Sequence, residues 1–362
     1  AYNSLHPDFA EQARLSALKN HAKASSALAQ VYSNLGLGYE GLEDLDRAVN
    51  AYQYALEFAP DQVKALKRLG AIRYKQGQAG EAVALLQQAQ DVAADDRGVA
   101  YAAILALQLD GRFAEAIAAC QQALAANPSA DLYALLGECH EESAQSEPAL
   151  AAYRQSLTLD PGHTPAHRGL SRLSAQAGHY QTAFASLEKV IALGRANAQD
   201  YANLGNLYFR TGARTEAEAA YRQAIEIEPS HAASHHDLAV VLRALQRPAE
   251  ASEALTRAIE LEPDNPDYHY KLGSIALALK QLQAAQQSLS TAIELGSHDA
   301  YAYLFLGRLY QEQDQVEKAL ALYEKMLTSP LLKTDERVRA QLKTYLSHMD
   351  REEARQLLYA FY

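Results

Sequence analysis

Several residue types are scarce in this chain of 362 residues. Tryptophan is absent, and the only two cysteines, Cys120 and Cys139, form no CxxC motif, which excludes zinc-ribbon and thioredoxin-like sites. Only 18 glycines and 11 prolines interrupt a composition rich in Ala, Leu and Gln, so we predict an almost entirely helical chain. No apolar run reaches the length of about 18 residues that a membrane-spanning helix needs.

An excess of positive charge is also missing. The 33 Lys and Arg residues against 44 Asp and Glu residues give a net charge of −11, which argues against nucleic acid as the partner. P-loop, GxGxxG, HExxH and GxSxG motifs are absent, so we predict that the chain is not an enzyme. The chain begins at Ala1 rather than Met, which fits a removed signal peptide or a piece of a longer protein. The compartment stays open, with the periplasm slightly favoured over the cytoplasm.

What the chain does contain is a period of 34 residues. The segment "YSNLGLGYEGLEDLDRAVNAYQYALEFAP", from Tyr32, aligns without a gap with "YANLGNLYFRTGARTEAEAAYRQAIEIEP", from Tyr201. An array from 29 to about 333 is therefore predicted, between an N-terminal helical cap at 1–28 and C-terminal capping helices at 334–362. Its nine units start, with one step of 33 residues, at Ala29, Val63, Arg97, Ala130, Thr164, Ala198, Ala232, Pro266 and Ala300.

Each unit has the pattern of two amphipathic helices. Apolar or small residues fall at positions 4, 7, 8 and 11, and again at positions 17, 20, 24 and 27, with a break near position 15. Position 20 is Ala in all nine units and position 8 is Gly in six, which predicts close contact between the two helices. Position 32 is Pro in five units and ends the second helix.

This pattern resembles the tetratricopeptide repeat (TPR) family over about five-sixths of the chain. The resemblance implies an all-α fold: a right-handed superhelix of nine helix-turn-helix repeats, with helix A lining the inner groove and helix B the outer face. It implies a non-catalytic protein–protein interaction scaffold or assembly factor that binds a partner segment in that groove. Position 4 lacks the family's usual Trp, and repeat three has Ala103 and Ile104 where Leu-Gly is usual.

In the family, positions 2, 5, 6, 9, 12 and 13 of helix A face the groove. Repeat two places Lys64, Lys67, Arg68 and Lys75 there, beside Asn34 of repeat one. Three of these residues match positions with which some TPR proteins hold a C-terminal carboxylate. The resemblance therefore predicts a site for an anion, an acidic peptide or a C-terminal tail, and a solvated basic face is the alternative.

Repeat four places acidic side chains at the same kind of position. Their oxygens could hold a hard cation such as Mn²⁺ or Ca²⁺, although no cofactor is required by any motif. Ion pairing with Arg168 and Arg172 of the next helix A is the simpler interpretation. The candidate metal residues are Asp131, Glu138, Glu141 and Glu142.

Repeats six to nine place aromatic and polar side chains together. Such a mixture suits a bound peptide, whereas packing of tyrosines between helices is the alternative for any one residue. Within "HAASHHDL", His235 takes position 4 and is predicted to pack, so that only the two residues after it face the groove. The candidate residues are Asn203, Asn206, Phe209, His236, Asp237, Tyr270, Lys271, Tyr301 and Phe305.

The apolar tail gives one further expectation. It either packs on repeat nine or contacts a partner, including a copy of the chain, so self-association through the C-terminal helix is an alternative. The tail residues are Leu357, Leu358, Tyr359, Phe361 and Tyr362.

Two narrower interpretations follow from the resemblance. The first is the substrate-selecting TPR arm of a larger enzyme or secretion protein, but the ladder of Asn at position 6 that such arms of O-linked N-acetylglucosamine transferases carry is missing here. In the second, the chain is similar to the processing-associated TPR proteins of cyanobacteria. The cyanobacterial proteins are periplasmic, bind the C-terminal region of the photosystem II D1 protein and load manganese. If the similarity extends to function, the acidic residues of repeat four and the pair His236 and Asp237 would be the metal ligands.

Overall fold

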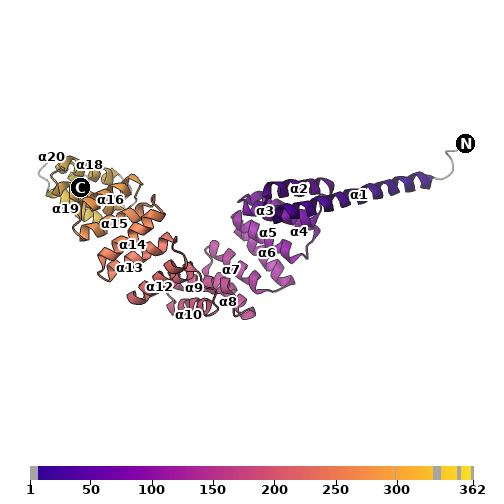
Figure 1. Cartoon of the computed structure of the whole chain (residues 1–362), viewed down its shortest axis with the longest axis horizontal. Helices are drawn as coiled ribbons and strands as arrows, with labels where there is room; N and C mark the ends of the chain where they lie inside the picture. The colour runs from indigo at the N-terminus through magenta and orange to yellow at the C-terminus, as the bar shows by residue number, and fades with distance from the viewer. Residues whose placement is uncertain (1–6, 298, 329–335, 349–351, 360–362) are drawn as a thin grey trace. The chain divides into compact units, whose positions relative to one another are not determined.

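The computed structural model describes residues 7–297, 299–328, 336–348 and 352–359, with side chains from Lys23 onward except those of residues 327, 328, 353, 356, 358 and 359. All secondary-structure elements in these residues are α-helices (Figure 1). The all-α repeat fold is thus confirmed. The helices are α1 (Pro7–Gly41), α2 (Leu45–Phe58), α3 (Val63–Lys75), α4 (Ala79–Val92), α5 (Arg97–Leu109), α6 (Phe113–Ala126), α7 (Ala130–Glu142), α8 (Ser146–Leu159), α9 (Thr164–Gln176), α10 (Tyr180–Ala192), α11 (Ala198–Arg210), α12 (Arg214–Ile227), α13 (Ala232–Ala244), α14 (Pro248–Leu261), α15 (Pro266–Ala278), α16 (Leu282–Glu294), α17 (Ala300–Glu312), α18 (Val316–Thr328), α19 (Glu336–Ser347) and α20 (Glu352–Tyr359).

Successive helices pair as the period predicts. The helix A segments of repeats two to nine are α3, α5, α7, α9, α11, α13, α15 and α17, and each begins at the residue at which the period starts a unit. The turn within a repeat needs a left-handed residue, which is glycine at Gly77, Gly111, Gly178 and Gly212. No described helix has the length and apolar character needed to cross a membrane.

The first helix departs from the expected boundary at residue 28. α1 runs without a break from Pro7 to Gly41, so the N-terminal segment and helix A of repeat one are a single helix. Its sequence offers no glycine or proline between Asp8 and Leu35, and nothing else there interrupts a helix.

The chain divides into two compact units, Ala1–Leu173 and Ser174–Tyr362, with the boundary inside α9. At the end of the second unit, Val338, Leu342 and Leu346 of α19 are fully buried in the core of repeat nine. Ala354 of α20 is also buried there, and Leu357 packs against the same core. The side chains of Leu358, Tyr359, Phe361 and Tyr362 lie outside the described residues, so the tail is tested only at Leu357.

The glycine at position 8 allows helix A to approach a large side chain of helix B. A methyl group added at Gly36, Gly137, Gly205 or Gly307 would lie 2.3–2.8 Å from the ring of the tyrosine at position 24 of the same repeat. Real contacts are never this short, so these positions require glycine, as the recurring small residue predicts. The rings belong to Tyr52, Tyr153, Tyr221 and Tyr323.

The same position 24 joins each repeat to the next. Its side chain shares a core with the residue at position 10 of the following helix A at every junction between repeats. Most of the residues at these two positions are aliphatic or aromatic. The pairs are Tyr52 with Ile72, Leu86 with Ala106, Cys120 with Cys139, Tyr153 with Leu173, Leu187 with Leu207, Tyr221 with Val241, Leu255 with Ile275, and Leu289 with Leu309.

Candidate functional site

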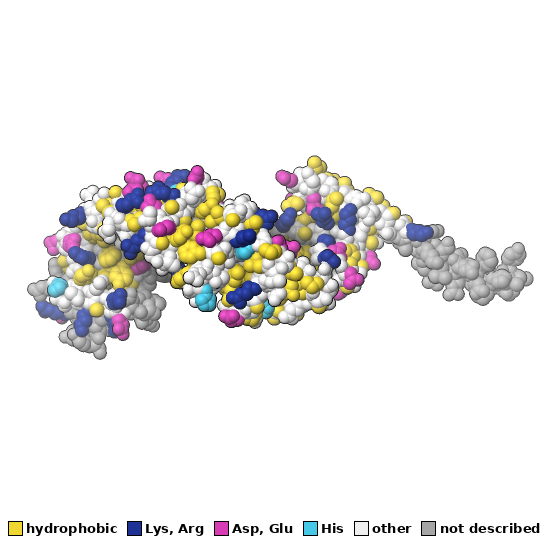
Figure 2. Space-filling model, turned by 90° about the horizontal axis from the view of Figure 1, so that it is seen from below, with side chains coloured by type: hydrophobic (Ala, Val, Ile, Leu, Met, Phe, Trp, Pro, Cys, Tyr) yellow, Lys and Arg dark blue, Asp and Glu magenta, His cyan; other side chains and the backbone are white. Residues whose placement is uncertain are grey.

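We call the surface made by positions 2, 5, 6, 9, 12 and 13 of each helix A the helix-A face. None of the sixteen residues predicted to bind a partner is buried. Together with the four candidate metal residues they form three sets: a basic set in repeats one and two, an acidic and basic set in repeats four and five, and a mixed set in repeats six to nine. Figure 2 shows basic, acidic and apolar side chains interspersed on the side of the molecule that it draws.

Three of the four cations in the basic set already bond to neighbouring side chains. Lys64 Nζ donates to Asn34 Oδ1 at 2.8 Å, so two of the three residues that match a carboxylate clamp bond to one another. Lys67 Nζ lies 3.1 Å from Asp96 Oδ1, and hydrogen bonds from Lys67 and from the backbone outweigh burial to lower the pKa of that carboxyl. Lys75 is exposed at the end of α3.

The third matching residue, Arg68, is also paired. Its NH1 lies 3.5 Å from Glu40 Oε2, and the hydroxyl of Tyr52 donates to the other oxygen of the same carboxylate. Sequence reasoning missed Glu40 and Asp96 as partners. Glu40 stands at position 12 of repeat one, a position already assigned to the helix-A face, so the signal was available; Asp96 is the last residue of repeat two and gave no such signal.

In the second set, Arg172 and Glu141 form a two-bond ion pair. Arg172 Nε donates to Glu141 Oε1 at 2.5 Å and Arg172 NH2 donates to Oε2 at 2.6 Å, while the hydroxyl of Tyr153 donates to Oε2 at 3.0 Å. The hydrogen bond to Glu141 raises the pKa of Arg172. Burial raises the pKa of the neighbouring Glu138, which Arg172 opposes. Ion pairing is thus what these two repeats contain; Arg168 also has an interaction partner and Glu142 is exposed.

The fourth acidic residue, Asp131, is engaged elsewhere. Its Oδ1 lies 3.0 Å from His163 Nε2. Within the described parts of the chain, no three His, Cys, Asp or Glu side chains are grouped so as to hold a metal ion. The structure therefore separates the four candidate metal residues into different interactions.

Asp131 and His163 form, with Ser156, the residue types of a hydrolase triad. Ser156 Oγ lies 3.2 Å from His163 Nδ1. However, Ser156 is fully buried, its hydroxyl donates to the carbonyl of Ala130 at 2.8 Å, and the backbone N–H of Ala166 donates to His163 Nδ1 at 3.3 Å. A nucleophile must reach substrate and pass its proton to the base, so this set has no catalytic geometry. Its hydrogen bonds join the two ends of repeat four, and one of them reaches Ala166 at the start of repeat five.

The centre of the mixed set is His236. Its Nδ1 lies 3.0 Å from Asp237 Oδ1 and its Nε2 lies 3.3 Å from Asp267 Oδ2, while its ring stacks on Tyr268 with centroids 5.2 Å apart. Burial alone lowers the pKa of His236, but the two carboxylates outweigh it and raise the pKa to about 9. His236 is therefore an imidazolium at neutral pH that joins α13 to α15. Lys271 Nζ lies 3.4 Å from Asp267 Oδ1.

Sequence reasoning missed Asp267, Tyr268 and Arg243 at this surface. Asp267 is position 2 of repeat eight and Arg243 is position 12 of repeat seven, so both stand at positions of the helix-A face and could have been found. Tyr268, at position 3, is buried and gave no such signal. Arg243 is exposed, and no ion-pair partner for it lies among the described side chains.

The aromatic part of the mixed set lies on α15 and α17. Tyr301 and Phe305 are in ring contact, with centroids 5.7 Å apart, and both pack partly against the core of repeat nine with Tyr270. Lys271 Nζ lies 5.5 Å from the centroid of the Tyr270 ring. Burial, with the nearby Asp299, raises the pKa of Tyr270 to about 12, and Arg243 opposes this. Earlier in the chain, on α11, Phe209 is half-buried and the side chain of Asn203 accepts a hydrogen bond from Gln199.

Comparison with protein families accounts for this architecture. A tetratricopeptide repeat model matches residues 33–98, 101–164 and 168–232, which is more than half of the chain, and further models of the same repeat match 208–275, 266–295 and 302–337. The chain belongs to the tetratricopeptide repeat family. TPR proteins are protein–protein interaction scaffolds and are typically not catalytic.

Known TPR proteins resemble parts of the chain. Superkiller protein 3 of Schizosaccharomyces pombe is 26% identical over 174 residues, which is 46% of this chain and 12% of that protein, so the match spans about an eighth of that protein's length. The structure described as pilF of Pseudomonas aeruginosa superposes with a TM-score of 0.53 at 18% identity, over 61% of this chain and 97% of that one. Cut9 and Hcn1 of an APC/C hetero-tetramer give 0.53 at 16% identity, over 84% of this chain and 59% of that one. These structural likenesses show the fold alone.

Histidine at position 4 replaces the family's Trp in three TPR units. His167, His235 and His269 each donate from Nε2 to the carbonyl of the proline at position 32 of the preceding repeat, at 3.0, 3.0 and 2.8 Å. His235 is also buried, which confirms that it packs. The neighbouring His231 lies 2.7 Å from Ser234 Oγ, so "HAASHHDL" has separate structural roles and not one metal site.

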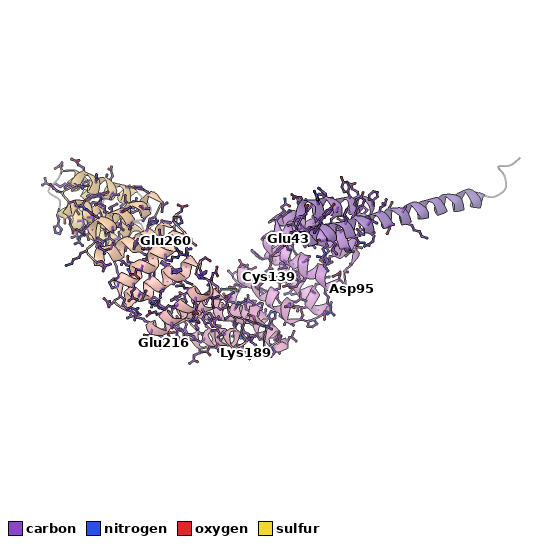
Figure 3. All side chains as sticks on the ribbon, in the orientation of Figure 1. Glu43, Asp95, Cys139, Lys189, Glu216 and Glu260 are labelled. Atoms are coloured by element: carbon purple, nitrogen blue, oxygen red, sulfur yellow. The ribbon has the colours of Figure 1, made fainter. Side chains whose placement is uncertain are left out.

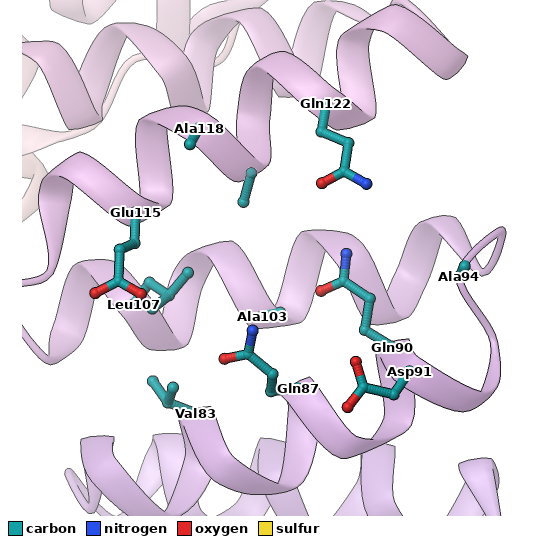
Figure 4. A pocket seen from close by; sticks show the side chains of 11 residues that line it. Val83, Gln87, Gln90, Asp91, Ala94, Ala103, Leu107, Glu115, Ala118 and Gln122 are labelled. Carbon is teal, nitrogen blue, oxygen red and sulfur yellow. The ribbon is translucent and has the colours of Figure 1, made fainter.

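The helix-B side of the TPR array carries furrows that sequence reasoning did not consider. One of these furrows, of about 570 Å³, is drawn in Figure 4; its lining is Val83, Gln87, Gln90 and Asp91 of α4, Ala94 in the turn after α4, Ala103 and Leu107 of α5, and Glu115, Ala118, Ala119 and Gln122 of α6. Furrows of about 410 and 710 Å³ occur at equivalent repeat positions over α13 and over α3. The furrow is therefore a regular product of stacking one helix B beside the next, with helix A as its floor.

Proposed function

We propose that the chain is a non-catalytic scaffold that binds a segment of another protein on the helix-A face of repeats seven to nine. One observation carries this choice of surface: Arg243 has no ion-pair partner among the described side chains and its charge acts on the half-buried Tyr270, while Tyr301 and Phe305 are in ring contact on the same helix-A face. In the basic set, by contrast, Lys64, Lys67 and Arg68 already bond to neighbours.

The chemistry of this surface favours a segment with a carboxylate next to an apolar side chain. A guanidinium recognises a carboxylate by two parallel hydrogen bonds, and rigid rings bury area at a small cost in conformational entropy. A C-terminal tail provides both groups. The partner is defined here by this chemistry and not by the photosystem II identity that the sequence resemblance suggests. The carboxylates of repeat four are not grouped as a metal site in the described part of the chain, so we propose no role in manganese delivery.

Selection of peptides on the immobilised chain tests this proposal. Peptides from a random library that ends in a free C-terminus are selected, and their affinity is measured by fluorescence anisotropy. We expect Arg243→Ala and Tyr301→Ala each to weaken binding about 10- to 100-fold. Arg257→Ala and Tyr54→Ala, which remove an exposed Arg and an exposed Tyr from helix B, should change affinity less than about twofold.

The proposal fails if the selected peptides bind equally well to both helix-A variants. Amidation of the peptide C-terminus should weaken binding to the wild type and leave binding to Arg243→Ala nearly unchanged. The proposal also fails if amidation leaves binding to the wild type unchanged, since the carboxylate would then have no partner at Arg243.

An alternative is that the chain is the partner-selecting TPR arm of a larger protein. The observation in its favour is that the matched Superkiller protein 3 is far longer than the aligned part. The genomic sequence on both sides of the segment that encodes this chain decides between an independent scaffold and an arm of a larger protein. A long adjoining domain would favour the arm, and a short reading frame would favour an independent scaffold.

A further inference from the structure

Repeat three has alanine at two positions that hold larger side chains in repeats one, two and four to eight. Position 4 is Ala100, where those repeats have Tyr, Leu or His. Position 30 is Ala126, where those repeats have Phe, Val, Leu or Ile. Repeat three is therefore the one among these eight repeats in which both positions are small.

The two positions face each other in the array. In repeat one, the rings of Tyr32 and Phe58, at positions 4 and 30, stack with centroids 5.7 Å apart. In repeat two, Leu66 at position 4 is buried in one cluster with Ala89 at position 27 and with Val99 at position 3 of the next repeat. A side chain at position 4 thus fills the space between helix B of its own repeat and the start of the next helix A.

In repeat three the same space is a hollow of about 250 Å³, which we call the repeat-three hollow. Its lining includes Ala100, Ala123 and Ala126, at positions 4, 27 and 30, and Leu132, at position 3 of repeat four. None of its lining residues stands at a position of the helix-A face. A cavity of about 150 Å³ can hold benzene, so this hollow has room for an aromatic side chain.

The hollow also has a backbone acceptor at a place that other repeats use. His167, His235 and His269, all at position 4, donate to the carbonyl at position 32 of the preceding repeat. The equivalent residue before repeat three is Ala94, which lines the hollow and lies in the turn after α4 (Figure 4). The Ala100 side chain has no donor for this carbonyl. An N–H or O–H on a ring seated as those imidazoles are would therefore have an acceptor.

The rim of the hollow carries negative charge. Asp95, which Figure 3 labels, lines the hollow, and Asp91 lines the adjoining furrow of Figure 4, which shares Ala94 with it. Both carboxylates are exposed, and neither has an ion-pair partner among the described side chains. Arg97 is the only Lys or Arg in the two linings. A cation next to an entering ring would therefore meet a complementary charge.

We propose that the repeat-three hollow binds one tryptophan or tyrosine ring of a partner protein, in a segment with a Lys or Arg next to that ring. The ring takes the place that position 4 side chains fill in other repeats, and its N–H or O–H donates to the Ala94 carbonyl. The neighbouring cation lies near Asp91 and Asp95. Because the hollow is outside the helix-A face, this site does not depend on the proposed binding surface of repeats seven to nine.

The chain contains no tryptophan, so the indole of a peptide reports binding directly. The probe is the peptide Gly-Lys-Trp-Lys-Gly, acetylated and amidated, with its fluorescence excited where tyrosine does not absorb. We expect a blue shift on binding to the full chain, with a Kd of about 0.1–1 mM for one side-chain anchor. Methylation of the indole nitrogen should weaken binding about 3- to 10-fold, and replacing both lysines with Glu should weaken it by a similar factor.

Two variants fill the hollow from opposite sides with side chains that other repeats carry. Ala100→Tyr and Ala126→Leu should each weaken binding at least about 10-fold. Ala125→Leu adds the same bulk at an exposed alanine of α6 outside the lining and should change affinity less than about twofold. Arg243→Ala should also leave the affinity unchanged, which separates this site from the helix-A face.

The proposal is overturned if the wild type gives no blue shift at peptide concentrations up to about 5 mM, or if a folded filling variant binds as the wild type does. Circular dichroism shows which variants are folded, and either filling variant suffices. NMR spectra of the wild-type chain with labelled alanine methyl groups give a test without variants: the peptide should shift the signals of Ala100, Ala123 and Ala126. Shifts confined to other alanines would contradict the proposal.

Discussion

Replacing His236 with Gln should weaken the second unit of the chain in a pH-dependent way. The His236 ring lies between Asp237 and Asp267 at 3.0 and 3.3 Å, and its side chain is only 17% exposed. Glutamine keeps a polar side chain of similar reach but cannot carry a positive charge. The variant therefore removes the charge that joins α13 to α15 while leaving a hydrogen-bonding group in place.

The magnitude follows from the pKa. The rise from 6.5 to about 9 corresponds to about 3.4 kcal/mol, at about 1.4 kcal/mol per pH unit. The Asp267 carboxylate is 49% exposed, and water around it screens the interaction. We therefore expect a loss of about 1–2 kcal/mol in the free energy of unfolding at pH 6.

The sign of the pH dependence is set by proton binding. Between pH 6.5 and 9 the folded chain keeps the His236 proton and the unfolded chain releases it, so the stabilisation is complete below pH 6.5 and is lost as pH rises through 9. The other groups facing His236 are Asp237, Asp267, Lys271 and Tyr268. Of these, burial raises the pKa of Tyr268 to about 12 and His236 lowers that of Asp267, so neither adds a transition in this window.

The measurement is urea unfolding followed by circular dichroism at pH 6, 7.5 and 9.5, together with an NMR titration of the imidazole signals. The wild type should lose its advantage over His236→Gln by pH 9.5, and the NMR midpoint of His236 should lie near 9. His269→Gln is the matched control, because His269 bonds a neutral carbonyl and its loss should be similar at each pH. A wild-type advantage that is equal at pH 6 and 9.5, or an NMR midpoint below 7, would refute the reasoning.

Two further predictions concern the first unit, with one comparison in the second. Gly137→Ala places a methyl group 2.6 Å from the Tyr153 ring and should lower the free energy of unfolding, measured thermally, by about 1–3 kcal/mol. Gly38→Ala has open space around it and should be neutral or stabilising by up to about 1 kcal/mol. Equal effects of the two variants would contradict the packing argument. Tyr153→Phe removes the hydrogen bond to Glu141 and should lower the free energy of unfolding by about 1 kcal/mol, whereas Tyr221→Phe should change it by less than about 0.5 kcal/mol. A larger loss for Tyr221→Phe than for Tyr153→Phe would show that the hydroxyl hydrogen bond does not cause the difference.

The fold was predictable because its signal is repeated. Each unit alone is a short amphipathic pair, but the alanines at position 20 and the glycines at position 8 recur at one spacing and fix where every later helix A starts. The expected boundary at residue 28 had no such support. Residues before Ala29 share helix-forming composition with those after it, and no cap or breaker separates them, so α1 continues through.

The site was less predictable, because its residues are long and their partners come from other repeats. From the period we predicted that Arg68, Arg172 and His236 lie outside the buried core, and none of them is buried. It could not show that Arg68 meets Glu40, or that His236 meets Asp267, since those choices depend on how far one helix A is shifted along the next. Position within a repeat predicts exposure, whereas pairing depends on the stacking of two repeats.

The tyrosine at position 24 shows how core and surface are linked in this array. Its ring packs on the position 8 glycine, and its hydroxyl reaches position 12 of the same helix A: Glu40 for Tyr52, Glu141 for Tyr153 and Gln311 for Tyr323. In repeats one and four that carboxylate also binds an Arg of the next helix A. Repeat six has Phe209 at position 12, so Tyr221 has no such acceptor. In repeats one and four, a buried ring thus holds an acid on the helix-A face, and the acid holds an arginine of the next repeat. Position 12 of repeat seven is instead Arg243, a cation with no ion-pair partner among the described side chains.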